Sequence, residues 1–94
     1  MNKVTVTFSV YGSFDYRRLI TSIKSAKRQK GCDVDIIVSE QNEKSRLEEE
    51  SKILDFKLYW DEPKYFYGSK PVYNPGEIRN KAVSRVESEF VYLN

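Results

Sequence analysis

The sequence predicts an α/β fold with a mostly parallel four-stranded sheet and helices on both of its faces. Strand-like and helix-like segments alternate along the 94 residues in the order β-α-β-α-β-loop-α-β, which is typical of parallel strands joined by crossover helices. The segment VDIIVSE at 34–40 has a continuous apolar core, as expected of a parallel strand buried on both faces. This length suffices for one small domain, which we take to span residues 1–94.

The first strand and the first helix are predicted from residue type and spacing. Residues 4–10, VTVTFSV, are β-branched and aromatic, and the Tyr-Gly that follows interrupts the run. From Asp15 to about Lys30 apolar residues recur at helical spacing along one face. Ser13 is expected to cap the beginning of this helix and Gly31 its end.

The middle of the chain predicts a surface helix, a strand and a loop. Residues 43–54 are acidic, with Glu48 and Lys52 at a spacing that pairs on a helix. Residues 56–60, FKLYW, alternate in polarity and predict the third strand. Residues 61–73 contain two prolines, one glycine and four aromatic residues, and we interpret them as a loop that either packs over the sheet or forms a lid.

The beginning of the last helix is marked by residues typical of a helix N-terminus. Asn74 can cap it, Pro75 suits its first position, and Glu77 stands three residues after the cap. Its apolar face is expected to comprise Ile78, Ala82, Val83 and Val86. The final strand is predicted over residues 89–94, EFVYLN.

Composition excludes several classes of function. A net charge of +2 is too small to indicate a nucleic-acid-binding protein. No apolar run approaches the roughly 20 residues of a membrane span, and the single cysteine, Cys32, suits a reducing compartment, so we expect a cytoplasmic protein. The chain has no histidine, which leaves carboxylates to supply any base or metal ligand.

The turn after the first strand excludes the commonest nucleotide-binding motifs. It reads SVYGSFD, with one glycine, and therefore matches neither the G-x-G-x-x-G of dinucleotide folds nor the phosphate-binding loop of nucleotide triphosphatases. The acidic pair of a flavodoxin-like receiver is also absent, since Val10 and Tyr11 follow the strand.

Three segments in order resemble the amino-terminal half of a family 2 glycosyltransferase with the GT-A fold. VTVTFSVYGSFDY resembles the first strand and turn of that family, VDIIVSEQNE its second strand, and NPGEIRNKAVSRVESEFVYLN the helix and strand that lead to its D-x-D metal motif. The resemblance implies a Rossmann-like nucleotide-diphospho-sugar-binding domain. It also implies that the chain is a truncated domain that ends at or just before the D-x-D motif.

The resemblance assigns nucleotide-binding roles to five residues. Ser9, Val10 and Tyr11 match the turn that lines the base pocket, where Tyr11 would cover a uracil ring and Ser9 would hydrogen-bond. Glu40 matches the aspartate that accepts a hydrogen bond from the uracil N3–H, and is one methylene longer. Arg79 matches the arginine of the family's A-R-N segment, which would reach the base and diphosphate or fix the carboxylates around the metal.

The metal role falls on the last residue of the chain. Asn94 lies at the first D-x-D position or just before it, and a neutral side chain there would bind a divalent cation less strongly than aspartate. In the parent enzyme, the resemblance implies that Mn²⁺ or Mg²⁺ neutralises the departing diphosphate.

The resemblance implies transfer of a sugar from a nucleotide-diphosphate donor, most simply a UDP-sugar, to a glycan acceptor in polysaccharide biosynthesis. A part of the enzyme outside this chain would bind the acceptor and supply the catalytic base. Any association with a membrane would also be through that part. We therefore expect this chain to bind nucleotide weakly at best and to be catalytically inactive.

Two alternatives remain open from the residues. A nucleotidyltransferase would have a Gly-rich, basic loop after the first strand, which VYGSFDY lacks. The other alternative is a non-catalytic α/β interaction or assembly module. A truncated sheet would expose an edge strand, and that edge favours homo-oligomer formation.

Overall fold

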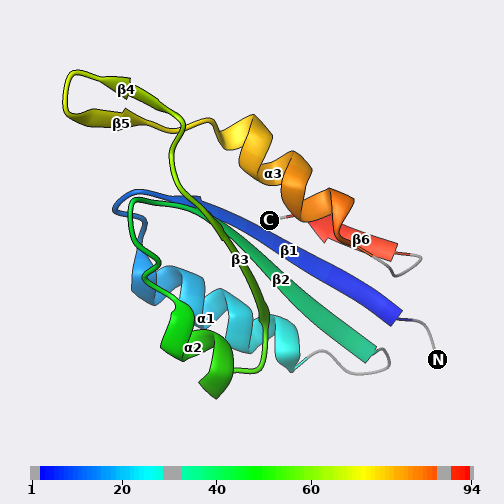
Figure 1. The fold of residues 1–94 in the computed structure, drawn as a ribbon. Coiled ribbons are helices and arrows are strands. Elements are labelled where there is room, and N and C mark those ends of the chain that lie inside the picture. Colours follow the sequence, from blue (N-terminus) through cyan, green and yellow to red (C-terminus); the bar gives the residue numbers. More distant parts are fainter. Residues whose placement is uncertain (1–2, 29–32, 87–89, 94) are drawn as a thin grey trace.

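The computed structural model describes residues 3–28, 33–86 and 90–93 and has an α/β architecture (Figure 1). Strands β1, β2 and β3 form a parallel sheet, and β6 pairs in parallel with the other edge of β1, giving the order β3-β2-β1-β6. Helices α1 and α2 lie on one face and α3 on the other. The predicted parallel α/β arrangement is thus confirmed. The elements are β1 Lys3–Tyr11, α1 Tyr16–Lys27, β2 Asp33–Gln41, α2 Glu48–Ile53, β3 Lys57–Asp61, β4 Tyr65–Tyr67, β5 Lys70–Val72, α3 Pro75–Ser84 and β6 Phe90–Leu93.

The main hydrophobic core lies between the sheet and α1. Val6 and Phe8 of β1 stand beside Ile36 and Val38 of β2, and alternation places all four on the same face. They pack with Leu19 and Ile23 of α1 and with Leu47 and Phe56, which flank α2. The even-numbered residues of β1 and β2 therefore face α1.

The opposite face of the sheet is covered by α3. Thr7 and Ile37, which stand beside each other in the register, are buried there. Ile78 and Ala82 are the buried residues of α3, in agreement with the predicted apolar face. Two of the predicted positions differ, because Val83 is 39% exposed and Val86 follows the end of the helix.

The two ends of α1 differ from the prediction. Asp15, not Ser13, is the N-cap, and its carboxylate accepts a hydrogen bond from Arg18 N–H at 3.1 Å. The helix ends at Lys27, with Arg28 as its C-cap. Gly31, the expected cap, lies outside the described residues. The N-cap of α3 is Asn74 with Pro75 next, which confirms that prediction.

The predicted helix over 43–54 is wrong in its first half. Only Glu48–Ile53 is helical, and residues 42–47 form a loop instead. The reason is a hydrogen bond to the preceding strand, since the N–H of Arg46 donates to the carboxylate of Glu40 at 3.0 Å. A backbone group committed to that carboxylate is not available to a helix that begins at residue 43.

The segment predicted as a loop contains a β-hairpin. Strand β4 pairs antiparallel with β5 around Gly68 and Ser69, and Gly68 has a φ of 64°, as required at the first position of a tight hairpin turn. The hairpin projects away from the sheet (Figure 1), and Tyr65 and Tyr67 are 62% and 84% exposed. These aromatic residues therefore do not cover the core.

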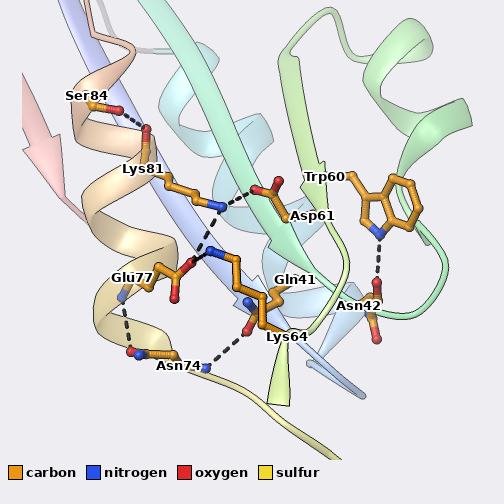
Figure 2. Close-up of polar contacts among 9 residues, drawn as sticks. All are labelled: Gln41, Asn42, Trp60, Asp61, Lys64, Asn74, Glu77, Lys81 and Ser84. Atoms are coloured by element: carbon orange, nitrogen blue, oxygen red, sulfur yellow. Dashed lines mark hydrogen bonds and ion pairs between the residues drawn. The ribbon is translucent and has the colours of Figure 1, made fainter. Parts of the chain in front are cut away.

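An ion pair links the base of the hairpin to α3 (Figure 2). Lys64 Nζ lies 2.8 Å from Glu77 Oε1, and Lys81 Nζ lies 3.2 Å from Asp61 Oδ2 and 3.6 Å from Glu77. The hydrogen bond between Lys64 and Glu77 lowers the pKa of Glu77 and raises the pKa of Lys64. These contacts join α3 to the carboxyl end of β3.

Candidate functional site

The carboxyl ends of β1, β2 and β3 lie at one edge of the sheet, where the connecting loops meet. The chain moves outward from β1 to β2 and β3, and then places β6 on the other side of β1. The order of strands therefore changes direction at β1. In open α/β sheets, ligands bind beyond the carboxyl ends of the strands at such a point.

A pocket of about 450 Å³ lies at the end of β1. It contains the three predicted residues of the turn, Ser9, Val10 and Tyr11. It is also lined by Gly12, Ser13, Phe14 and Tyr73. The structure thus brings one predicted group together and adds Tyr73 from the aromatic segment.

Two tyrosines form the aromatic wall of this pocket. The ring centroids of Tyr11 and Tyr73 are 5.4 Å apart, with an interplanar angle of 33°. The Tyr73 hydroxyl donates to Asn42 Oδ1 at 3.4 Å, which orients its ring, whereas Tyr11 is 43% exposed. A flat, partly exposed ring beside a fixed one suits stacking against a planar ligand.

Gly12 allows the close approach of Tyr73. Its φ is 57°, and a Cβ added there would lie 3.1 Å from Tyr73 Cε2. We expect Gly12→Ala to lower the free energy of unfolding by about 2 kcal/mol, through the backbone conformation and the displacement of the ring. Urea unfolding measures this loss.

Gly68→Ala is the matched control, because Gly68 has a φ of 64° but no atom within 4 Å of an added Cβ. It should lose only the conformational part, about 1 kcal/mol. Equal losses at the two positions would show that the approach of Tyr73 to Gly12 carries no energy.

Asn42 connects the parts of this edge. Its side-chain Nδ2 donates to the Gly12 carbonyl at 2.9 Å. Its backbone carbonyl accepts from Trp60 Nε1 at 2.9 Å (Figure 2). Beside it, Gln41 Oε1 accepts from the Asn74 N–H at 3.1 Å. The amide side chains of Asn42 and Gln41 thus hold the turn after β1 and the segment before α3, and the backbone carbonyl of Asn42 holds the end of β3.

Glu40 is fully buried beneath the loop 42–47. Its carboxylate accepts from the Ser45 hydroxyl at 2.7 Å, from Arg46 N–H at 3.0 Å and from Asn42 Nδ2 at 3.3 Å. Its side chain lies on the α1 face of the sheet, like the other even-numbered residues of β2. A direct contact with a base would require the carboxylate to release one of these donors.

Arg46 places a cation beside the pocket. Its guanidinium lies 4.6 Å from the centre of the Phe14 ring, and Nη1 donates to the Gly12 carbonyl at 3.3 Å. Both contacts are with residues that line the pocket. The exposed guanidinium can therefore meet an anionic group at the mouth of the pocket.

The remaining predicted residues lie elsewhere. Arg79 is exposed on α3 and is not among the residues that line the pocket. Asn94, the predicted metal ligand, lies outside the described residues. Within residues 3–28, 33–86 and 90–93, no three acidic or cysteine side chains are grouped so that they could hold a metal ion.

Sequence reasoning missed Asn42 and Arg46 as parts of this edge. Asn42 follows directly after the buried strand, a position from which a side chain reaches the ligand-binding edge, so its location could have been predicted. Arg46 gave no such signal, because it stood inside a predicted helix. Tyr73 is one of four aromatic residues of a segment that the sequence predicts either to pack over the sheet or to stack on a sugar and form part of a lid near the donor.

Comparison of the chain with protein-family models, with curated proteins and with solved structures finds no significant match in any of the three. In the part of the chain that the structure describes, no helix is long and apolar enough to cross a membrane.

Proposed function

We propose that this chain is the nucleotide-sugar-binding part of a family 2 glycosyltransferase with a GT-A fold, and that its pocket holds the base of a UDP-sugar. The observation that carries the proposal is the pocket itself. It combines an aromatic wall with a serine at the carboxyl end of β1, where the strand order changes direction. The resemblance of three ordered segments to that family supplies the identity of the ligand.

The turn after β1 would bind the base. The exposed ring of Tyr11 would stack on uracil, with Tyr73 behind it and the Ser9 hydroxyl at the rim. Gly12 N–H donates to the Gln41 carbonyl, so the backbone groups of Ser9 and Tyr11 point to the opposite edge of β1. Among the described residues β6 pairs with β1 only as far as Thr7, which leaves those groups for a base.

Charge at the mouth of the pocket would come from Arg46. Its guanidinium is held against Gly12 and Phe14, from where it can pair with a diphosphate. Glu40 would act by fixing the loop that carries this arginine, in addition to or in place of the contact with N3–H that the resemblance assigns to it. Arg79 would contact the ligand only if its side chain extended from α3 toward the pocket.

The catalytic steps of the parent enzyme would take place outside this chain. There, a sugar would pass from the UDP-sugar to a glycan acceptor, with Mn²⁺ or Mg²⁺ neutralising the diphosphate. The described residues offer no group of side chains for that metal. In this proposal the chain holds the base and the diphosphate, and the purified chain should show no transfer activity.

Titration of UDP and of uridine into the purified chain tests the proposal. We expect UDP to bind with a Kd of order 1 mM, about 4 kcal/mol of binding free energy. Tyr11→Ala should weaken this binding by roughly tenfold because it removes a stacking ring, and Tyr11→Phe, which keeps the ring, should not. Arg46→Gln should weaken the binding of UDP and leave that of uridine unchanged.

The contrary results are equally specific. A chain that binds neither ligand, or in which Tyr11→Ala and Tyr11→Phe behave alike, has no base pocket at the end of β1. The assembly-module alternative would then stand, supported by the aromatic residues exposed on the hairpin. Loss of uridine binding in Arg46→Gln would show that this arginine supports the fold of the pocket and does not select the diphosphate.

A further inference from the structure

Among the residues that the structure describes, β3 is an edge strand of the sheet. Its inner edge pairs with β2, and in the order β3-β2-β1-β6 it has no neighbour on the other side. The central residues Leu58 and Tyr59 are half-buried, and Trp60 is 40% exposed. Such an edge presents free backbone donors and acceptors to another strand.

Two copies of β3 have complementary charges when they are placed antiparallel to each other. It reads KLYWD, with a cation at its beginning, an anion at its end and apolar residues between them. In an antiparallel pair centred on Tyr59, Lys57 of one copy stands opposite Asp61 of the other. We propose that β3 pairs with β3 of a second copy of this chain in this register, forming a symmetric dimer with a continuous sheet.

The backbone of β3 has the correct phase for this pairing. Asn42 N–H donates to the Asp61 carbonyl at 3.1 Å, so the backbone groups of Asp61 face β2. Because successive residues direct these groups to opposite edges, those of Leu58 and Trp60 face outward. In the proposed register Leu58 stands directly opposite Trp60 of the second copy, and each such pair can exchange two hydrogen bonds.

Neighbouring registers lose the charge pairing. If the two-fold axis passed through Leu58, Asp61 would stand opposite Asp55 of the other copy, and like charges directly opposite are destabilising. If it passed through Trp60, Lys57 would stand opposite Pro63 and would have no acidic partner. Only the axis at Tyr59 satisfies both ends of the strand.

The charged ends of β3 are accessible for this contact. Lys57 is exposed, and the side chain of Asp61 is 36% exposed. Lys81 lies closest to Oδ2 of Asp61, which leaves the second carboxylate oxygen for Lys57 of the other copy. The exposed part of Trp60 would pack across the interface against Leu58.

A disulfide placed at the two-fold axis tests the register. In a Cys32→Ser background, Tyr59→Cys should form a disulfide-linked dimer on mild oxidation. Residues at a non-hydrogen-bonded antiparallel position have Cα atoms about 4.5 Å apart, within the range that a disulfide spans. Lys57→Cys is the control, because the two copies of residue 57 would be four positions, or roughly 13 Å, apart.

Association in solution gives an independent measurement. Sedimentation velocity of the unmodified chain should show a monomer–dimer equilibrium that Lys57→Glu shifts at least tenfold toward monomer. Lys52→Glu makes the same charge change at an exposed position of α2, outside the paired strand, and should leave the equilibrium unchanged.

Three results would overturn the inference. They are a chain that stays monomeric at millimolar concentration, equal cross-linking at residues 57 and 59, and equal effects of the two glutamate variants. Melting temperatures of all the variants show whether Tyr59→Cys, which removes the stacking of Arg85 on this ring, still folds.

Discussion

Replacement of Glu40 with alanine should lower the free energy of unfolding by about 3 kcal/mol, because it leaves buried donors without an acceptor. The carboxylate is fully buried and accepts from the Ser45 hydroxyl, Arg46 N–H and Asn42 Nδ2. In a chain of this size the melting temperature should fall by roughly 15 °C. Thermal unfolding followed by circular dichroism measures the change.

Two matched variants isolate the cause. Glu43→Ala removes a carboxylate of the same kind from an exposed position in the same loop, and should change stability by less than about 0.5 kcal/mol. Glu40→Gln keeps one carbonyl oxygen in place and should fall between the other two. If Glu40→Ala unfolded at the same temperature as Glu43→Ala, the buried carboxylate would not be holding the loop.

Leu47→Ala should be comparably destabilising, by about 3 kcal/mol, for a reason of packing. None of the six residues of α2 is buried, whereas Leu47, its N-cap, is fully buried in the main core. The leucine therefore attaches α2 and the loop before it to the sheet. Urea unfolding gives the loss in free energy.

Ile53→Ala is the control for this variant, because Ile53 is 79% exposed on the same short helix. It removes a similar number of carbon atoms from solvent-exposed surface, so its effect should stay below about 0.5 kcal/mol. Equal losses at residues 47 and 53 would mean that Leu47 does not anchor this part of the chain.

The parallel framework could be predicted from the sequence because its signals are local. The apolar run of β2 and the cap formed by Asn74 and Pro75 each fix an element through residues that are close in sequence. The hairpin was predictable in part, since residues 65–67 and 70–72 flank a Gly-Ser turn. Pro71 argued against it, yet Pro71 pairs with Phe66 at a position where neither N–H is needed in the ladder.

The loop 42–47 could not be predicted, because its conformation depends on the orientation of the buried carboxylate of Glu40 at the end of β2. Nothing in EQNEKSRLEEE indicates that the Glu40 side chain would turn toward this segment and accept a hydrogen bond from the N–H of Arg46. The same fact limits the prediction of the site. The turn residues 9–11 could be placed at the site because they lie at the end of a predicted strand. Arg46 reaches the pocket only through the conformation of a loop that has no sequence pattern of its own.

The position of Asn42 has a consequence for how the molecule opens locally. Because this one side chain bonds the turn after β1 and the Tyr73 hydroxyl, these segments should separate from the sheet together and not one by one. Amide hydrogens around residues 12 and 42 would then exchange with solvent at one common rate. The amide hydrogens of the projecting hairpin, which Asn42 does not hold, would exchange much faster. The ligand-binding edge would therefore open as one cooperative unit, independently of the hairpin.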